Sequence, residues 1–167
     1  MAKIGLISDT HSNLEFLKEA ADFLVHQQKI NCFYHCGDDY HDADLLLDYG
    51  LPLLRVPGIF EPLYKEKSVP AIQTDEVEGS NIILLHDIKD LNPEAQQRAQ
   101  IVIYGHSHQY EAEKREGKIY INPGHLKDVS HKGRPASFGL LSLSQKEILV
   151  KIFNLSKKVL LDKDFSI

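Results

Sequence analysis

Four short apolar runs in the sequence end directly in aspartate or histidine residues, and this repeated pattern constrains the fold more than any other feature. The residues that follow the runs are Asp9-Thr10-His11, Gly37-Asp38, His86 and Gly105-His106-Ser107-His108. Short apolar runs bounded by polar or glycine-rich loops are typical of buried β-strands. Functional groups in α/β sheets gather beyond the carboxyl ends of the strands. We therefore expect the four loops to meet at one edge of the sheets.

The rest of the chain alternates between expected helices and strands. Helical spacing of apolar residues predicts a helix from Ser12 or Asn13 to about Gln28, and shorter helices over 43–49 and 93–100. No strand is expected after residue 153, where Lys157 and Lys158 are interpreted as solvated surface charge. Mixed strands with helices on both sides predict an α/β fold, a two-sheet mixed β sandwich flanked by helices. The expected strands are 3–8, 31–36, 51–56, 71–77, 81–85, 101–104, 110–115, 118–122, 137–143 and 147–153.

Length and composition predict one ordinary globular domain spanning residues 1–167, with 43% hydrophobic and 26% charged residues. A net charge of -5 makes nucleic acid an unexpected partner, because phosphate binding normally needs a basic face. No stretch approaches the roughly 20 apolar residues of a membrane span, and Asp9 interrupts any secretory signal at the start. We therefore expect a cytoplasmic protein without a membrane partner.

The aspartate and histidine residues at the expected strand ends are candidate metal ligands. Alternate residues on an extended segment point to one side, so a pair such as Asp9 and His11 could hold one ion. A single Asp-x-His is more often a coincidence, but four such groups at strand ends favour a metal centre. Imidazole and carboxylate together suit Mn, which we expect first, or Ni, Zn, Fe or Co. Two ions about 3.5 to 4 Å apart would use six ligands, namely Asp9, His11, Asp38, His86, His106 and His108.

The order of these ligands, with a glycine after a strand at Gly58, resembles the calcineurin-like metallophosphoesterases over nearly the whole chain. The short length and the sequence Asn122-Pro123-Gly124 resemble the small YfcE-type phosphodiesterases within that superfamily. The resemblance implies that Asp38 bridges two metals. It further implies that the first metal is held by Asp9, His11 and His108 and the second by His86 and His106.

The sequence departs from the family pattern after Gly58. Ile59 stands where the family has an asparagine ligand, and an aliphatic side chain cannot ligate, so we expect a weakened second site. Three nearby carboxylates, Asp39, Glu61 and Asp87, are alternative ligands or acids, although each could equally be a solvated loop residue. Phe60 stands where larger members carry a catalytic histidine, so esters with good leaving groups should react best.

These features together predict a metal-dependent phosphodiesterase in which a metal-bridging hydroxide attacks phosphorus. Its substrate would be a small phosphodiester or phosphate ester, and the family resemblance makes a homo-oligomer conceivable. We expect Asp38, His86 and His125 to be catalytic, His125 because it stands where small members carry serine. Little weight falls on the other histidines, His26, His35, His41 and His131.

Two other functions remain open at the level of sequence. A non-catalytic protein-binding scaffold is one, since a retromer coat subunit shares this fold with a degenerate metal site. Clustered imidazoles beside carboxylates argue against it, because such groups are costly to bury without a metal. A metal-dependent nuclease is the other, and it would need a basic track leading to the metals.

Overall fold

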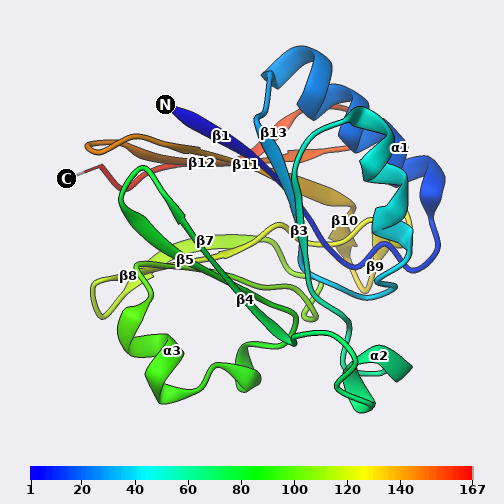
Figure 1. The fold of residues 1–167 in the computed structure, drawn as a ribbon. Helices are drawn as coiled ribbons and strands as arrows, with labels where there is room; N and C mark the ends of the chain where they lie inside the picture. The colour runs from blue at the N-terminus through cyan, green and yellow to red at the C-terminus, as the bar shows by residue number, and fades with distance from the viewer. Residues whose placement is uncertain (167) are drawn as a thin grey trace.

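A computed structural model describes residues 1–166, and two β-sheets dominate it. The sheets lie face to face, with helices on their outer faces (Figure 1). The first sheet has the strand order β13-β12-β11-β1-β2-β3, and the second has the order β4-β5-β6-β8-β7. The expected two-sheet α/β sandwich flanked by helices is confirmed.

The first sheet is built around β1 (Ala2–Ile7), which pairs in parallel with β2 (Cys32–His35) and antiparallel with β11 (Ser137–Leu143). On one side the sheet ends in parallel β3 (Leu53–Arg55). On the other side it continues through antiparallel β12 (Ile148–Asn154) and β13 (Val159–Asp164). The carboxyl ends of β1, β2 and β3 therefore meet at one edge.

The second sheet also contains three neighbouring parallel strands, β5 (Ser80–Leu85), β6 (Ile101–Ile103) and β8 (Lys118–Asn122). Antiparallel β4 (Ile72–Val77) and β7 (Glu111–Arg115) form its two borders. A small separate hairpin joins β9 (Ser130–His131) to β10 (Arg134–Pro135).

The helices are short, and side chains begin several of them. In α1 (Leu14–Phe23) the side chain of Asn13 accepts a hydrogen bond from the Phe16 amide, and the helix continues as a π turn over Leu24–Gln28. A 3₁₀ helix spans Asp42–Tyr49 and a second spans Ile88–Asp90. The remaining helices are α2 (Pro62–Lys65) and α3 (Pro93–Arg98). Among residues 1–166, no helix has the length and apolar character needed to cross a membrane.

Alternation along β1 shows how the layers are held together. Ile4 and Leu6 are fully buried between the two sheets, whereas Ile7 is buried beneath α1 with Leu17 and Phe138. Successive side chains of a strand point to opposite faces, so one strand serves both cores. A third apolar cluster packs α3 against the outer face of the second sheet.

The end of the chain differs from the sequence prediction. Residues 159–164 form the edge strand β13, and this strand was not expected because its side chains are mostly exposed and carry little apolar alternation. Lys157 lies at the surface, where its ammonium group contacts the Glu19 carboxylate and the Leu155 carbonyl, and Lys158 is exposed.

Two adjacent leucines in the 3₁₀ helix test this packing. Leu46 is fully buried beneath α1, whereas Leu47 is 53% exposed. We expect Leu46→Ala to lower the free energy of unfolding by about 2 to 5 kcal/mol, because it leaves a cavity. Leu47→Ala should change it by less than about 0.5 kcal/mol in urea titrations. Equal losses in the two variants would contradict the packing described for Asp42–Tyr49.

Candidate metal centre

The candidate ligands lie in loops that leave the carboxyl ends of parallel strands from both sheets. Asp9 and His11 follow β1, and Asp38 follows β2. His86 follows β5 of the second sheet, and His106 and His108 follow β6. The sandwich therefore brings side chains that are about 100 positions apart in sequence to one edge.

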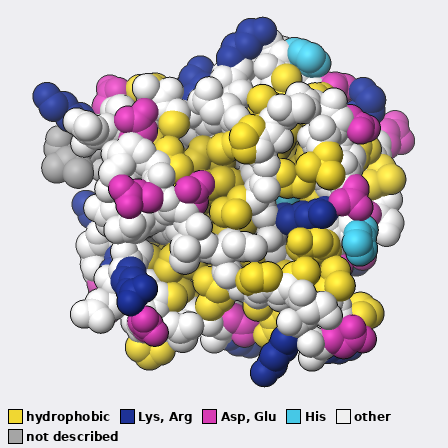
Figure 2. All heavy atoms as spheres, viewed as in Figure 1, with side chains coloured by type: hydrophobic (Ala, Val, Ile, Leu, Met, Phe, Trp, Pro, Cys, Tyr) yellow, Lys and Arg dark blue, Asp and Glu magenta, His cyan; other side chains and the backbone are white. Residues whose placement is uncertain are grey.

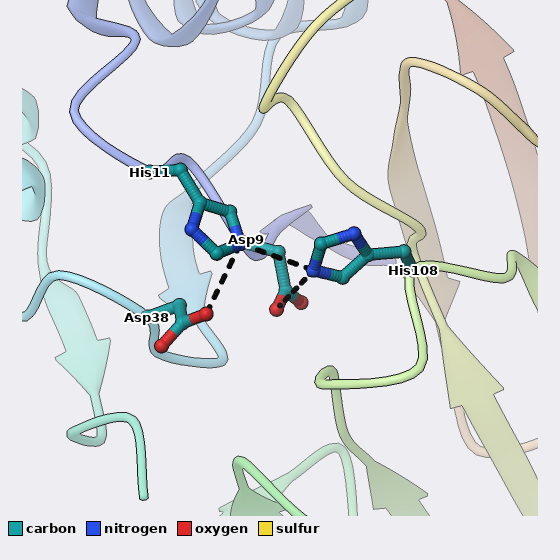
Figure 3. Close-up of side chains that lie close together, drawn as sticks. All are labelled: Asp9, His11, Asp38 and His108. Carbon is teal, nitrogen blue, oxygen red and sulfur yellow. Dashed lines mark hydrogen bonds and ion pairs between the residues drawn. The ribbon is translucent and has the colours of Figure 1, made fainter. Parts of the chain in front are cut away.

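Four of these side chains converge closely (Figure 3). His11 Nε2 lies 3.1 Å from Asp38 Oδ2 and 3.0 Å from His108 Nε2. His108 Nε2 in turn lies 3.2 Å from Asp9 Oδ1. One ligand atom from each residue lies within 4.8 Å of the other three. This spacing allows all four atoms to face a single cation.

Asp9 is the most deeply held member of the group. Its side chain is fully buried, and Oδ2 accepts hydrogen bonds from the Ser8 hydroxyl and from the His106 amide, 3.0 Å away. Burial would raise the pKa of Asp9, but the neighbouring His108 and His86 imidazoles and the hydrogen bond from Ser8 lower the pKa below its ordinary value. The carboxylate is therefore ionised, and its buried Oδ1 has no hydrogen-bond partner.

Two glycines make room for these carboxylates. A Cβ atom on Gly105 would lie 2.7 Å from Asp9 Oδ2, and one on Gly58 would lie 2.4 Å from Asp38 Oδ1. Both distances are too short for any side chain. The glycine expected after the third strand thus has a physical role, which is to let the loop approach Asp38 closely.

The backbone that carries the ligands is left-handed, and the expectation of extended segments at Asp9-x-His11 and His106-x-His108 is wrong. The φ angles are 53° at Asp9, 47° at His11, 64° at His106 and 60° at His108. Asp38 shares this conformation, with φ of 57°. Residues other than glycine rarely adopt it, although aspartate and histidine do so more often than most. Tight turns, rather than the alternation of a strand, therefore aim these side chains inward.

His86 and His106 lie beside the four-residue group. Their rings are 5.1 Å apart, and His86 Nε2 is 4.0 Å from Asp38 Oδ1. The Nδ1 atom of His86 lies 2.7 Å from the Cys36 carbonyl oxygen, which can only accept. Nδ1 therefore carries the proton, and the buried Nε2, which has no partner, presents its lone pair toward the site.

These observations fit a divalent metal. Two buried polar atoms without partners, Asp9 Oδ1 and His86 Nε2, are costly unless a cation satisfies them. Burial lowers the pKa of His11 even though Asp38 opposes the shift, and this favours the neutral imidazole that metals require. Nitrogen and carboxylate donors together suit Mn, Fe, Co, Ni or Zn.

His125 and His131 pack around His108. The three rings form a cluster with centroid distances of 4.8 to 5.8 Å. His131 Nδ1 lies 2.8 Å from His108 Nδ1, which leaves His108 Nε2 free to face Asp9. His125 is fully buried, with Nε2 3.1 Å from the Arg134 carbonyl oxygen, and burial lowers its pKa. Its expected contact with substrate stays a prediction.

His131 is a neighbour of the site that the sequence pattern does not single out, and the signal that could have found it is the hairpin that carries it. Lys132 and Gly133, with φ of 51° and 76°, form the two-residue turn between β9 and β10. Glycine at the second position of a two-residue turn is a frequent signature of β-hairpins. His26 and His41 are exposed, whereas His35 is fully buried and accepts a hydrogen bond from the Gly37 amide.

A hollow of about 360 Å³ opens above the ligands. Its mouth carries three cationic side chains, Lys127, Lys132 and Arg134. Phe60, which is 69% exposed, lies on the same hollow with its ring centroid 6.3 Å from that of His106. The local charge at the mouth is thus positive although the chain as a whole is acidic.

Comparison with known proteins decides the family. The sequence profile of the calcineurin-like phosphoesterase superfamily domain matches residues 2–146. The chain belongs to that superfamily. The resemblance inferred from the motifs is therefore confirmed.

Several known proteins are similar to this chain in sequence or in structure. A phosphodiesterase of Methanocaldococcus jannaschii, MJ0936, is 22% identical over 87% of this chain and 95% of its own length. The E. coli phosphoesterase YfcE superposes with a TM-score of 0.74 at 19% identity, covering 96% of this chain and 98% of YfcE. Vps29 of Entamoeba histolytica, solved with zinc, gives a TM-score of 0.71 at 21% identity over 98% and 99% of the two chains.

His131 offers a test of how the first ligand group is positioned. We expect His131→Ala to weaken Mn binding about 10-fold, because the ring that holds His108 Nδ1 is lost while every ligand remains. Calorimetric titration of metal-free protein measures the change. His26→Ala removes an exposed histidine away from the site and should leave the titration unchanged. Unaltered affinity in His131→Ala would mean that His108 needs no such support.

Proposed function

We propose that this member of the superfamily is a metal-dependent phosphodiesterase acting on small phosphodiesters. The observation that carries the proposal is the convergence of Asp9, His11, Asp38 and His108 on a common point. Divalent metals at such a centre supply positive charge for phosphoryl oxygens and lower the pKa of water, which is the chemistry that ester hydrolysis needs. In this proposal six side chains hold two ions, and Mn is the first choice of metal.

The protein's own groups would bind and orient the ester. Lys127, Lys132 and Arg134 surround the mouth and attract an anionic substrate toward the hollow. Arg134 is held in place because its guanidinium group donates to the Ser107 carbonyl. In the reaction, the oxygen of a water bonds to phosphorus and gives up a proton to solvent, while the bond from phosphorus to the leaving oxygen breaks and the leaving oxygen takes up a proton.

Support for diesters with good leaving groups comes from Phe60. Its ring occupies the mouth beside His106, where it can contact a planar substituent but cannot donate a proton. The name of the relative from Methanocaldococcus jannaschii supports a phosphodiesterase over a phosphomonoesterase.

A cytoplasmic location and self-association also remain predictions, and sedimentation of the purified protein tests the latter.

A non-catalytic scaffold is the second candidate, and the Vps29 structures favour it because they share the fold. Since one of them was solved with zinc, metal binding alone does not separate a scaffold from an enzyme. On the face drawn in Figure 2, apolar side chains are visible among polar ones, and basic side chains are scattered singly among acidic ones. That face offers a protein partner apolar surface, and it offers nucleic acid no continuous basic track.

Loss of metal ligands tests the proposed activity. Asp38→Asn and His108→Ala should each lower hydrolysis of bis(p-nitrophenyl) phosphate with Mn by about 100-fold or more, because each removes a ligand from a loop end. Circular dichroism should show an intact fold. Asp48→Asn, an exposed site away from the cluster, is the matched control. A natural chain that binds Mn yet hydrolyses neither diesters nor monoesters would favour the scaffold.

The leaving group provides a separate test. Rates for a series of aryl phosphodiesters should fall steeply as the pKa of the leaving phenol rises, because no acid stands at position 60. Phe60→His should raise the rate of the poorest substrates at least about 10-fold by supplying a proton donor. Phe60→Leu, which supplies none, is the control. A flat dependence in the natural chain would show that another residue already donates the proton.

A further inference from the structure

The loop after β3 cannot supply the ligand that the family pattern places there. Ile59 has no ligand atom, and the neighbouring carboxylate of Glu61 is already occupied. Its Oε1 accepts from the Tyr40 amide at 2.6 Å, and its Oε2 accepts from the Gly58 amide. Both oxygens of Glu61 thus accept backbone hydrogen bonds that close its own loop, and neither is directed at a predicted ligand by any contact among residues 1–166. Asp39 lies with Oδ2 3.4 Å from the Ser12 hydroxyl.

Asp87 occupies a different position among the three candidate carboxylates. It follows His86 directly, and the residue is only 7% exposed. Its Oδ1 accepts from the Lys89 amide at 3.0 Å and so caps the short helix Ile88–Asp90. Its Oδ2 lies 3.8 Å from His106 Nε2. One oxygen thus fixes the side chain, and the other faces a predicted ligand.

Two close pairs lie on this side of the site, Asp87 with His106 and His86 with Asp38. Two atoms that each bind one ion at about 2.1 Å lie roughly 3.0 to 4.2 Å apart, depending on the angle between the bonds. The separations of 3.8 Å between Asp87 and His106 and 4.0 Å between His86 and Asp38 fall within that range. The buried Nε2 of His86 has no other partner and independently indicates a cation beside it.

We infer that Asp87 Oδ2 takes the place of the missing asparagine at the second metal, together with Asp38, His86 and His106. This inference rests on the proposed two-metal function and names a ligand for its second site. A carboxylate replaces a neutral amide there, so the second ion is held by two negative charges. Added negative charge strengthens cation binding, and carboxylate ligands favour Mn among the candidate ions. The second site is therefore not weakened by Ile59.

Calorimetric titration of Mn into metal-free protein tests the inference. The natural chain should show two binding events, and Asp87→Ala should weaken one of them about 10- to 100-fold while the other is unchanged. Asp87→Asn keeps an oxygen that can accept from the Lys89 amide, and should give an intermediate loss. His11→Ala should weaken the opposite event, which assigns the two sites. Ile59→Asn should leave both events close to those of the natural chain.

Asp90→Ala is the matched control, because Asp90 lies on the same turn but contacts the Tyr64 hydroxyl at 2.9 Å. Thermal unfolding without metal should confirm that Asp87→Ala is folded, and visible spectra of the Co-substituted protein report ligand loss without any assay of activity. Unchanged titration in Asp87→Ala, or a single binding event in the natural chain, would overturn the inference. An inactive protein with the expected loss in Asp87→Ala would overturn only the proposed function.

Discussion

The buried carboxylate of Asp9 is the interaction on which the arrangement of the site depends. Its backbone amide donates to the Gly37 carbonyl at 2.9 Å, which joins the loops after β1 and β2. Its carbonyl accepts from the Leu126 amide at 3.1 Å, and its side chain accepts from the His106 amide at 3.0 Å. One residue thus links the first sheet to the second and to the loop that carries His125. Its buried carboxylate accepts hydrogen bonds only at Oδ2, so Oδ1 is left for a cation to satisfy.

The ligand loops also depend on strained backbone that this network holds in place. Left-handed conformations at residues other than glycine cost of order 1 to 3 kcal/mol each and persist only where the surroundings fix them. Asp9, His11, Asp38, His106 and His108 all adopt this conformation. The hydrogen bonds to Asp9 and the close approach of Gly58 and Gly105 are such surroundings. Five of the thirteen described non-glycine residues with positive φ are predicted ligands.

The two-sheet sandwich could be predicted because each buried strand is a short apolar run in the sequence, as in Ile101–Ile103 before Gly105. Sequence reasoning also recovered which loops meet, because the carboxyl ends of parallel strands share an edge. It missed β13, whose exposed residues carry no such signal, and it gave His131 little weight because its contact with His108 joins two segments that are far apart in the sequence. Nor could it choose among Asp39, Glu61 and Asp87. That choice depends on which carboxylate oxygen faces another predicted ligand, as Asp87 Oδ2 faces His106 Nε2.

Because the ligands come from both sheets, cation binding and sheet packing are linked. Asp9 and Asp38 lie in loops that follow strands of the first sheet, and His86 and His108 lie in loops that follow strands of the second. A cation that binds the folded chain and not the unfolded chain stabilises the folded state, by about 2.7 kcal/mol when its concentration is 100 times its Kd. Without a cation, the unpartnered atoms of Asp9 and His86 oppose the same packing. The edge where the two sheets meet therefore costs stability when empty and contributes stability when filled. Buried, unpartnered carboxylate and imidazole atoms do not stabilise the packing of the two sheets by themselves. Their presence therefore favours a protein that binds a metal at this edge over one that has the fold but binds no metal.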